Sequence, residues 1–207
     1  MVAETQASAT RGRPRDPSRH RAVLKATADL LAEVGYEALT LSAVARRAKV
    51  GRPLIYQWWG SKAALAQEVL FQAGGDTDGS AAAPKPFVET FAALVSDMVE
   101  HQFRPEYRRG LPGLIGEMVA DPQLQQVAEE RFIAPIRAHY VAVIERGIAE
   151  NVVRPDADGA AILDTLRGAV MFHAVVSPVS PTLDAEALVS HLLGLVLNGV
   201  LVHGSPG

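Results

Sequence analysis

The sequence predicts an all-α protein, and three observations lead to this fold class. Apolar residues recur at the helical spacing of three and four positions from Ser18 onward. No segment shows the alternation of apolar and polar residues that a half-buried strand requires, and no internal repeat is present. Capping and helix-ending residues separate the periodic segments. With 207 residues, the chain is long enough to bury a large core in one or two domains.

The first periodic segment predicts a helix over residues 18–34. Ser18 is expected to cap its N-terminus, and Gly35 stands just past its last apolar position. Residues 1–17 are small, polar and basic and have no periodic pattern, so we expect a flexible basic arm. Two interpretations of this arm are open: it lies along a phosphate backbone, or it is a solvated tail.

Two short helices joined by three residues come next. Thr40 is expected to cap a helix over 41–48, and a second helix is expected over 52–58. Pro53 stands in the first turn of the second helix, where its missing N–H is not needed. Ser61 predicts the start of a fourth helix, whose apolar residues keep the helical spacing.

The composition changes after the fourth helix. Residues 74–86 are rich in Gly, Ala and Pro and show no period, which is typical of a linker. We therefore divide the chain after the arm into an N-terminal helical domain over 18–66, a connecting helix and linker over 67–86, and a C-terminal helical domain over 87–207.

The C-terminal domain is predicted to be helical, with breaks at its prolines and glycines. A helix that begins at Phe87 is expected to stop near Pro105, and a shorter helix over 114–119 follows a Gly/Pro-rich segment. Asp121, with a proline directly after it, predicts the start of a long helix that is kinked at Pro135. A loop is expected between this helix and the last two.

The last two predicted helices, over 158–176 and 183–202, are too apolar for an exposed surface. Their few charged residues, Asp164 and Arg167 among them, are expected on the outer faces. Glycines on both helices would let another helix approach closely. We expect the two helices to pair with their symmetry mates as the four-helix interface of a homodimer. No stretch of 18 uncharged apolar residues occurs, so no membrane-spanning segment is expected.

Charge is distributed unevenly along the chain. The formal net charge of the whole chain is −3. Residues 1–62 hold 11 Lys and Arg against 5 acidic residues, a net charge of +6. The remaining residues hold 9 basic and 18 acidic side chains, a net charge of −9. A basic N-terminal part on an acidic remainder indicates that the N-terminal part meets a polyanion.

Several classes of function are disfavoured by what the sequence lacks. The chain has no cysteine, which excludes disulfide scaffolds, thiolate zinc sites and cysteine nucleophiles. It has no Gly-rich phosphate loop, no G-x-S-x-G motif and no metal-ligand spacing, so we expect no enzyme, no cofactor and no metal site. No apolar leader follows the first methionine, and the cytoplasm is the expected location. A helical module that binds only other proteins is the open alternative.

The two short helices have the arrangement of a helix-turn-helix, in which the second, or recognition, helix lies in the major groove of DNA. The sequence of this helix, RPLIYQWW, suits that role. Arg52 can reach a phosphate or a guanine, Gln57 can pair with adenine, and Tyr56 can donate to a phosphate. Pro53 and Leu54 can make apolar contact with a thymine methyl group. A helix-turn-helix that serves only as a packing unit is the structural alternative.

Several coupled positions in and around this unit match a known signature. They are GYEALT at 35–40, VA at 44–45, AKV at 48–50 and IYQWWGSK at 55–62. In these residues the sequence resembles the TetR-type transcriptional regulators, over about residues 18–66. The resemblance implies a homodimer whose C-terminal domains dimerise and bind a small molecule. It further implies a repressor that binds a palindromic operator in double-stranded DNA and is released by a small-molecule effector.

The resemblance also assigns roles to individual residues. Thr40 matches the phosphate-contacting start of the first short helix, and Tyr56 matches a tyrosine that contacts phosphate. Lys62 matches a lysine at the start of the fourth helix, which binds phosphate with help from the helix N-terminus. Ser42 is a further candidate for a phosphate contact. The base-proximal face of the recognition helix corresponds to Arg52, Pro53, Leu54, Gln57 and Trp58.

Four positions depart from the family pattern. Lys49 replaces the usual turn glycine, and a lysine at positive φ costs about 1 kcal/mol relative to glycine. Leu54 replaces a common threonine and Trp58 a common histidine, which affects the target sequence rather than the mode of binding. Trp59 takes the place of a phenylalanine that packs inside.

The two arginines that end the first short helix either contact DNA or complement the helix dipole.

An effector pocket is implied by the resemblance alone. Candidate lining groups are polar or bulky side chains on otherwise apolar helices, and for each of them a place in the hydrophobic core is the alternative. The candidates are Phe91, Met98, His101, Phe103, Met118, Phe132, His139, Tyr140, Phe172 and His173.

Overall fold

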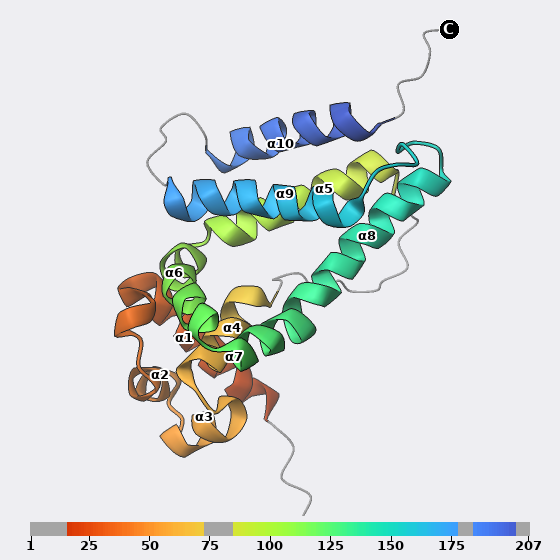
Figure 1. Cartoon of the computed structure of the whole chain (residues 1–207). Coiled ribbons are helices and arrows are strands. Elements are labelled where there is room, and N and C mark those ends of the chain that lie inside the picture. Colours follow the sequence, from red (N-terminus) through yellow and green to blue (C-terminus); the bar gives the residue numbers. More distant parts are fainter. Residues whose placement is uncertain (1–15, 73–84, 178–183, 202–207) are drawn as a thin grey trace, which may run out of the picture.

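The structure is a computed structural model that describes residues 16–72, 85–177 and 184–201. Within these ranges it consists of helices and one isolated β-bridge between Val153 and Leu201, so the predicted all-α fold is confirmed. The predicted arm up to residue 15, the predicted linker up to residue 84, and residues 178–183 and 202–207 lie outside the described ranges. The helices form a head, α1–α4, and a body, α5–α10 (Figure 1). Their bounds are α1 Pro17–Ala38, α2 Leu41–Ala48, α3 Arg52–Trp59, α4 Lys62–Phe71, α5 Phe87–Phe103, α6 Pro105–Ala120, α7 Pro122–Ala128, η1 Glu129–Ile133, α8 Ala134–Ala149, α9 Gly159–Met171, η2 Phe172–Val176 and α10 Ala185–Val200.

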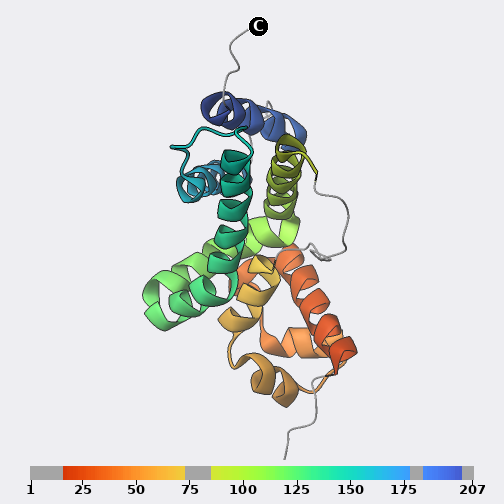
Figure 2. The same ribbon diagram turned by 90° about the vertical axis from the view of Figure 1, so that its right-hand side faces the viewer.

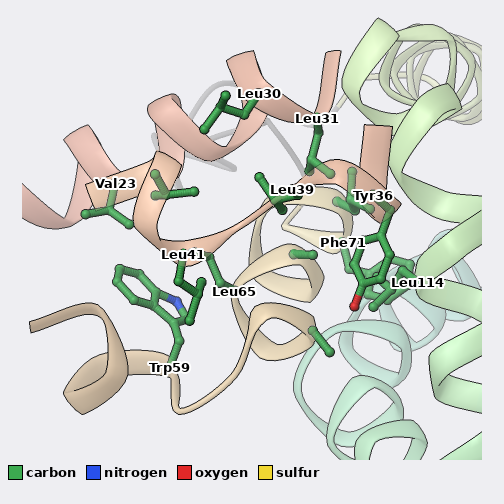
Figure 3. Close-up of a cluster of buried hydrophobic side chains, with 14 of the residues drawn as sticks. Val23, Leu30, Leu31, Tyr36, Leu39, Leu41, Trp59, Leu65, Phe71 and Leu114 are labelled. Atoms are coloured by element: carbon green, nitrogen blue, oxygen red, sulfur yellow. The ribbon is translucent and has the colours of Figure 1, made fainter. Parts of the chain in front are cut away.

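The four helices of the head pack around one hydrophobic cluster (Figure 3). Val23 and Leu31 of α1, Leu41 of α2, Ile55 of α3 and Leu65 of α4 are all buried in it. The helical spacing of apolar residues places these side chains on one side of each helix, so the cluster can close. The opposite sides of the short helices stay available for contacts with other molecules.

Two of the three predicted N-caps of the head are confirmed. The Thr40 hydroxyl accepts a hydrogen bond from the Ala43 N–H at 3.2 Å, at the start of α2. The Ser61 hydroxyl accepts one from the Ala64 N–H at 3.0 Å, at the start of α4. Each bond satisfies a backbone donor that has no partner inside its helix, so the helix starts are fixed by local sequence.

The ends of α1 differ from the prediction. Asp16, not Ser18, is the N-cap, and its carboxylate accepts from the Ser18 N–H at 3.0 Å. The helical backbone breaks at Gly35, whose φ of 76° lies in the region that favours glycine. One further turn continues to Ala38. The end predicted at residue 34 is therefore a kink, because the chain resumes a helical turn after the glycine.

The expected interruption between Pro105 and residue 114 is wrong, because α6 runs through this segment without a break. Packing explains the glycines there. A Cβ on Gly113 would lie 2.7 Å from Cδ1 of Tyr36, and one on Gly110 would lie 3.1 Å from a methyl group of Leu70. The glycines let α6 approach α1 and α4, so tertiary contact outweighs their low helix propensity.

The predicted kink at Pro135 takes the form of a π-helix. Asp121 caps α7 as predicted, and accepts from the N–H groups of the two residues that follow the proline. The five-residue π-helix η1 then precedes α8, and the Ala134 N–H donates to Glu129 O. Pro135 has no N–H to give to the preceding turn, and the wider turn absorbs this loss. In both views, α8 extends from beside the head to the far end of the body (Figures 1 and 2).

The body has its own hydrophobic cluster. Phe87, Phe91 and Val95 of α5 pack with Ile144 of α8 and Leu166 of α9, and all five are buried. Phe87 and Phe91 stack with ring centres 5.7 Å apart. This cluster, rather than the head, sets how α5, α8 and α9 lie together.

Large apolar side chains of the last two helices are exposed. The exposed fractions are 51% for Phe172, 64% for Val176 and 62% for Leu195. The segment Gly159–Val176 has a mean hydropathy of 1.3 and is 28% buried, so by length and composition alone it could cross a membrane. The same values describe a helix that keeps an apolar face uncovered in a single chain.

Candidate nucleic-acid interface and effector cavity

Backbone hydrogen bonds hold the turn of the helix-turn-helix. The Val50 N–H donates to Ala45 O at 3.0 Å, at the end of α2. Lys49 has φ 55° and ψ 41°, which is left-handed backbone. The lysine therefore takes the conformation that favours glycine, and its exposed side chain adds a positive charge beside the turn. Gly51 then serves as the N-cap of α3.

The recognition helix α3 buries one face and exposes the other. Ile55 and Trp59 pack inside the head. The side chains on the outer face are one and four positions apart, so they form one ridge. Of the residues predicted to face DNA, the structure exposes Arg52, Pro53, Tyr56 and Gln57 and half-buries Leu54 and Trp58.

Two residues of this ridge already contact each other. The Arg52 guanidinium donates to the Tyr56 hydroxyl at 2.9 Å, and its central carbon lies 5.2 Å from the centre of the Tyr56 ring. The contact holds both side chains on the exposed face. Tyr56 can still donate its own proton to a phosphate, because its hydroxyl oxygen is the acceptor in this bond.

The predicted phosphate contacts stand at two helix N-termini. Thr40 and Ser42 are exposed at the start of α2. Lys62 is half-buried at the start of α4, and its Nζ donates to Tyr36 O at 3.3 Å and lies 4.1 Å from the centre of the Tyr36 ring. The lysine charge is therefore held close to a helix N-terminus, where an anion is favoured.

The two arginines that end α2 differ from each other. The Arg47 guanidinium binds both carboxylate oxygens of Glu33, at 2.6 and 2.7 Å. Hydrogen bonds from Arg47 hold the pKa of the exposed Glu33 carboxyl below its usual range. Arg46 is exposed and has no such bond in the described part of the chain. The geometry favours a structural role for Arg47, and for Arg46 both alternatives, DNA contact and interaction with the helix dipole, stay open.

Sequence reasoning missed a buried carboxylate beneath the recognition helix. Glu68 of α4 is 5% exposed and accepts from Trp59 Nε1 at 2.8 Å. His20 Nε2 lies 3.0 Å from the other oxygen, Glu68 Oε1. Arg131 Nη2 lies 3.4 Å from Glu68 Oε2, the oxygen that also accepts from Trp59. The His20 ring also stacks on Trp59 at 5.0 Å. The only signal in the sequence was one acid inside the apolar run of α4.

This network explains why a tryptophan occupies the position of an inward-packing phenylalanine. Trp59 buries its ring as expected, and its N–H also reaches Glu68. One carboxylate therefore joins α1, α3 and α4 to η1, through His20, Trp59 and Arg131. Buried carboxylates require such donors, because desolvation of the charge is otherwise unfavourable.

A cavity of about 570 Å³ lies where the end of the head meets the body. Leu70 and Phe71 at the end of α4 form one wall, and side chains from α5, α6, η1, α8 and α9 form the others. Of the predicted effector contacts, Met98, His101, His139 and Tyr140 line it. The remaining candidates, Phe91, Phe103, Met118, Phe132, Phe172 and His173, do not.

Four of these candidates have another place in the structure. Phe91 is fully buried in the cluster of the body. Phe132 belongs to the cluster of the head, against which Met118 also packs. Phe172 is exposed on η2. Phe91 and Phe132 therefore lie in the hydrophobic core, which was the alternative to a place in the effector pocket.

One hydrogen bond joins the cavity to the head directly. His101 Nε2 lies 2.7 Å from Leu70 O, in the last turn of α4. Since a carbonyl accepts, this ring nitrogen carries the proton. Burial lowers the pKa of His101, so the ring is neutral at neutral pH. Tyr140 likewise donates to Leu94 O at 2.7 Å, and burial raises its pKa.

The cavity contains two arginines that the sequence did not assign to it. Arg104 and Arg167 both line it and are half-buried. Arg167 was expected on an outer face of the dimer helices, and this expectation is wrong. Asp164 remains exposed, where it pairs with Arg137 at 3.3 Å. Three positions separate the two residues, but the packing of α9 against α5 turns only Arg167 inward.

A helix-turn-helix with an exposed recognition helix, carried on an all-helical body, defines the class of helix-turn-helix transcriptional regulators. Comparison with known families supports this class over most of the chain. The family model "Bacterial regulatory proteins, tetR family" matches residues 23–69. The model "Tetracyclin repressor-like, C-terminal domain" matches residues 86–182.

Individual relatives agree with this result. The helix-turn-helix-type transcriptional regulator YdeS of Bacillus subtilis (strain 168) is 32% identical over 174 residues, which cover 81% of this chain and 83% of the relative. The regulator Mb1581 of Mycobacterium bovis is 23% identical over 186 residues, 87% of this chain and 91% of the relative. The crystal structure of the TetR family regulator SCO0332 matches with a TM-score of 0.64 and 27% identity, over 89% of this chain and 100% of the other. The chain belongs to the TetR family of transcriptional regulators.

Proposed function

We propose that the protein is a cytoplasmic repressor that binds a palindromic operator as a homodimer and leaves it when a small molecule occupies the cavity. The exposed ridge of α3 carries this proposal. Arg52, Tyr56 and Gln57 present donors and acceptors that suit phosphates and base edges, on a helix whose other face is locked into the head.

The dimer is supported by the uncovered face of the last two helices. Phe172, Val176 and Leu195 expose apolar surface that a second chain would bury. A Cβ on Gly168 or Gly194 would meet nothing within 4 Å, so the backbone there is open to a closely packed helix. A two-fold dimer would present two recognition helices to DNA, and the operator would share that symmetry.

Release by an effector is supported by the position of α4. This helix carries Lys62 at its first residue and Leu70 and Phe71 at the wall of the cavity. A ligand that shifts the end of α4 would also shift the lysine at its start. The change in DNA affinity can be no larger than the preference of the ligand for one state over the other.

Binding to the DNA upstream of its own gene tests the proposal. Purified protein should retard that fragment at low salt, while a scrambled fragment of the same length and composition should be retarded far less. If neither fragment is retarded more than the other, the regulator has no operator there and the proposal fails. Equilibrium sedimentation tests the dimer separately, because a stable monomer at micromolar concentration would contradict it.

A further inference from the structure

We propose that the cavity takes an apolar carboxylic acid, whose carboxylate binds between Arg104 and Arg167 and whose hydrocarbon part lies against the end of α4. The inference rests on the proposed function in treating this cavity as the effector site. It adds the chemical class of the effector, which neither the fold nor the family fixes.

Arg104 and Arg167 stand apart from the other arginines of the body. Arg108 and Arg109 donate to backbone carbonyls, at 2.8 Å each. The rest lie within ion-pair distance of a carboxylate, and these are Arg131, Arg137, Arg146 and Arg154. Neither Arg104 nor Arg167 has an ion pair or a side-chain hydrogen bond with any residue in the described ranges, although both are half-buried. A partly desolvated guanidinium without a partner is a site where an anion gains a charge-assisted bond.

Arg104 and Arg167 both line the cavity, and the charges of both act on His101. Burial is the main cause of the lowered pKa of His101, and the charges of Arg104 and Arg167 lower it further. Arg167 also opposes the rise that burial produces in the pKa of Tyr107 and Tyr140. Arg167 lines the cavity together with these three side chains, so its charge acts on the polar groups there.

Apolar side chains line a large part of the rest of the cavity. Leu70 and Phe71 face the cavity from the head, Ile133 faces it from η1, and Leu94 and Met98 face it from α5. A volume of about 570 Å³ is in the range that small-molecule sites occupy. A ligand that fills it must therefore bury hydrocarbon against these walls while its head group reaches the arginines. Planar carboxylates fit the fork of an arginine by two parallel bonds.

Two acids, Asp97 and Glu100, also line the cavity, and they define the competing possibility of a cationic ligand. Both are exposed, whereas both arginines are half-buried. Water already solvates and screens the exposed carboxylates, so pairing with them contributes little. The half-buried arginines gain more from a partner, and this difference favours an anion.

A matched set of compounds tests the inference on the full-length protein without DNA. Decanoic acid, phenylbutanoic acid and naphthylacetic acid would each be compared by calorimetry with the alcohol and the amine of the same skeleton, below micelle-forming concentrations. At least one acid should bind, and about tenfold or more tightly than its alcohol, with the amine weakest. If no acid binds at millimolar concentration, or if an alcohol or amine binds as tightly as the acid, the inference is wrong.

Variants locate the head group. Arg167→Gln and Arg104→Gln should each remove most of the advantage of the acid over the alcohol while the affinity for the alcohol stays unchanged. Arg137→Gln is the matched control, because Arg137 is half-buried but pairs with Asp164 and lies outside the cavity lining. An unchanged preference in both cavity variants would place the carboxylate elsewhere and overturn the assignment.

The proposed function is tested by DNA binding, which is a different measurement from calorimetry of the ligand. Adding the bound acid to the complex with operator DNA should release the DNA. Tight binding of the acid without release would leave the ligand class intact and contradict effector control. Absence of DNA binding would contradict the repressor proposal while the calorimetric result still decides the ligand class.

Discussion

The head and the body use their buried charges in opposite ways. In the head, Glu68 lies beneath the recognition helix with donors from three other elements. In the body, Arg104 and Arg167 face a cavity with no ion pair or side-chain hydrogen bond among the described residues. The buried carboxylate of the head is therefore paired, in part by Arg131 of η1, and the head exposes the ridge of α3 for contact with DNA. The body leaves charges and an apolar face open, as a part that gains its partners from a ligand and a second chain would do.

The largest expected effect tests whether the body is well packed away from its cavity. Phe91→Ala should lower the free energy of unfolding by about 3–5 kcal/mol, because Phe91 is fully buried and its removal leaves a hole in the cluster of the body. Urea denaturation at one fixed protein concentration measures the change, since a dimer makes stability depend on concentration.

Val88→Ala on the same helix is the control, because Val88 is 41% exposed. Its effect should stay within about 0.5 kcal/mol. A similarly small effect of Phe91→Ala would mean that α5 is loosely held, and the contrast between open cavity and closed core would then fail.

Substitutions at the junction of head and body should have the next largest effect on stability. Gly113→Ala should destabilise the protein by about 1–3 kcal/mol, because the added methyl group would meet the side chain of Tyr36 at 2.7 Å. Gly116→Ala, in the same helix with nothing within 4 Å, should instead stabilise it by up to about 1 kcal/mol. Thermal unfolding of both variants measures the difference. Equal shifts would show that α6 is not held tightly against α1.

The same junction shows where sequence reasoning is strong and where it stops. The caps Thr40, Ser61 and Asp121 were predicted, since a cap bonds to backbone only two or three residues away. The glycines of α6 are typical of a helix break, and the break predicted from them is wrong because α6 is continuous. Their role depends on Tyr36 and Leu70, which are far away in the sequence.

The site divides along the same line. The exposed ridge of α3 was predicted from a short motif, because its residues share one helix face. The partners of Glu68 come from three elements, and no spacing in the sequence relates His20 to Arg131. Likewise, the spacing of apolar residues in α9 does not show which face of the helix the rest of the body covers. Arg167 was therefore predicted on the wrong face.

The Glu68 network predicts a more specific effect, which is no larger than that of Gly113→Ala. Trp59→Phe keeps the buried ring and removes the N–H that Glu68 accepts, so stability should fall by about 1–3 kcal/mol. Operator affinity should fall as well, because the last turn of the recognition helix loses its anchor. A double-mutant cycle with Glu68→Leu measures the coupling from urea unfolding and from DNA titration. Additive effects of the two substitutions would mean that this hydrogen bond does not position α3.

The last effect concerns DNA binding alone and separates base reading from phosphate binding on the surface of the head. Gln57→Ala should cost about 1–3 kcal/mol at one base pair of the operator and little elsewhere, since Gln57 is exposed on the ridge and suits an adenine edge. Lys62→Ala should weaken binding to all sequences about equally and reduce the salt slope by about one. Affinities for the operator and its single-base variants at several salt concentrations measure both.

The two substitutions can be told apart because Gln57 and Lys62 have different surroundings. Gln57 projects from α3 with its side chain exposed, so its energy with DNA depends on the base that it meets. Lys62 is half-buried over Tyr36 at a helix N-terminus, and this site favours any phosphate. If Gln57→Ala instead lowered the affinity uniformly and left the preference for each base unchanged, Gln57 would be a backbone contact, and sequence reading would have to come from Arg52 and its neighbours on the ridge.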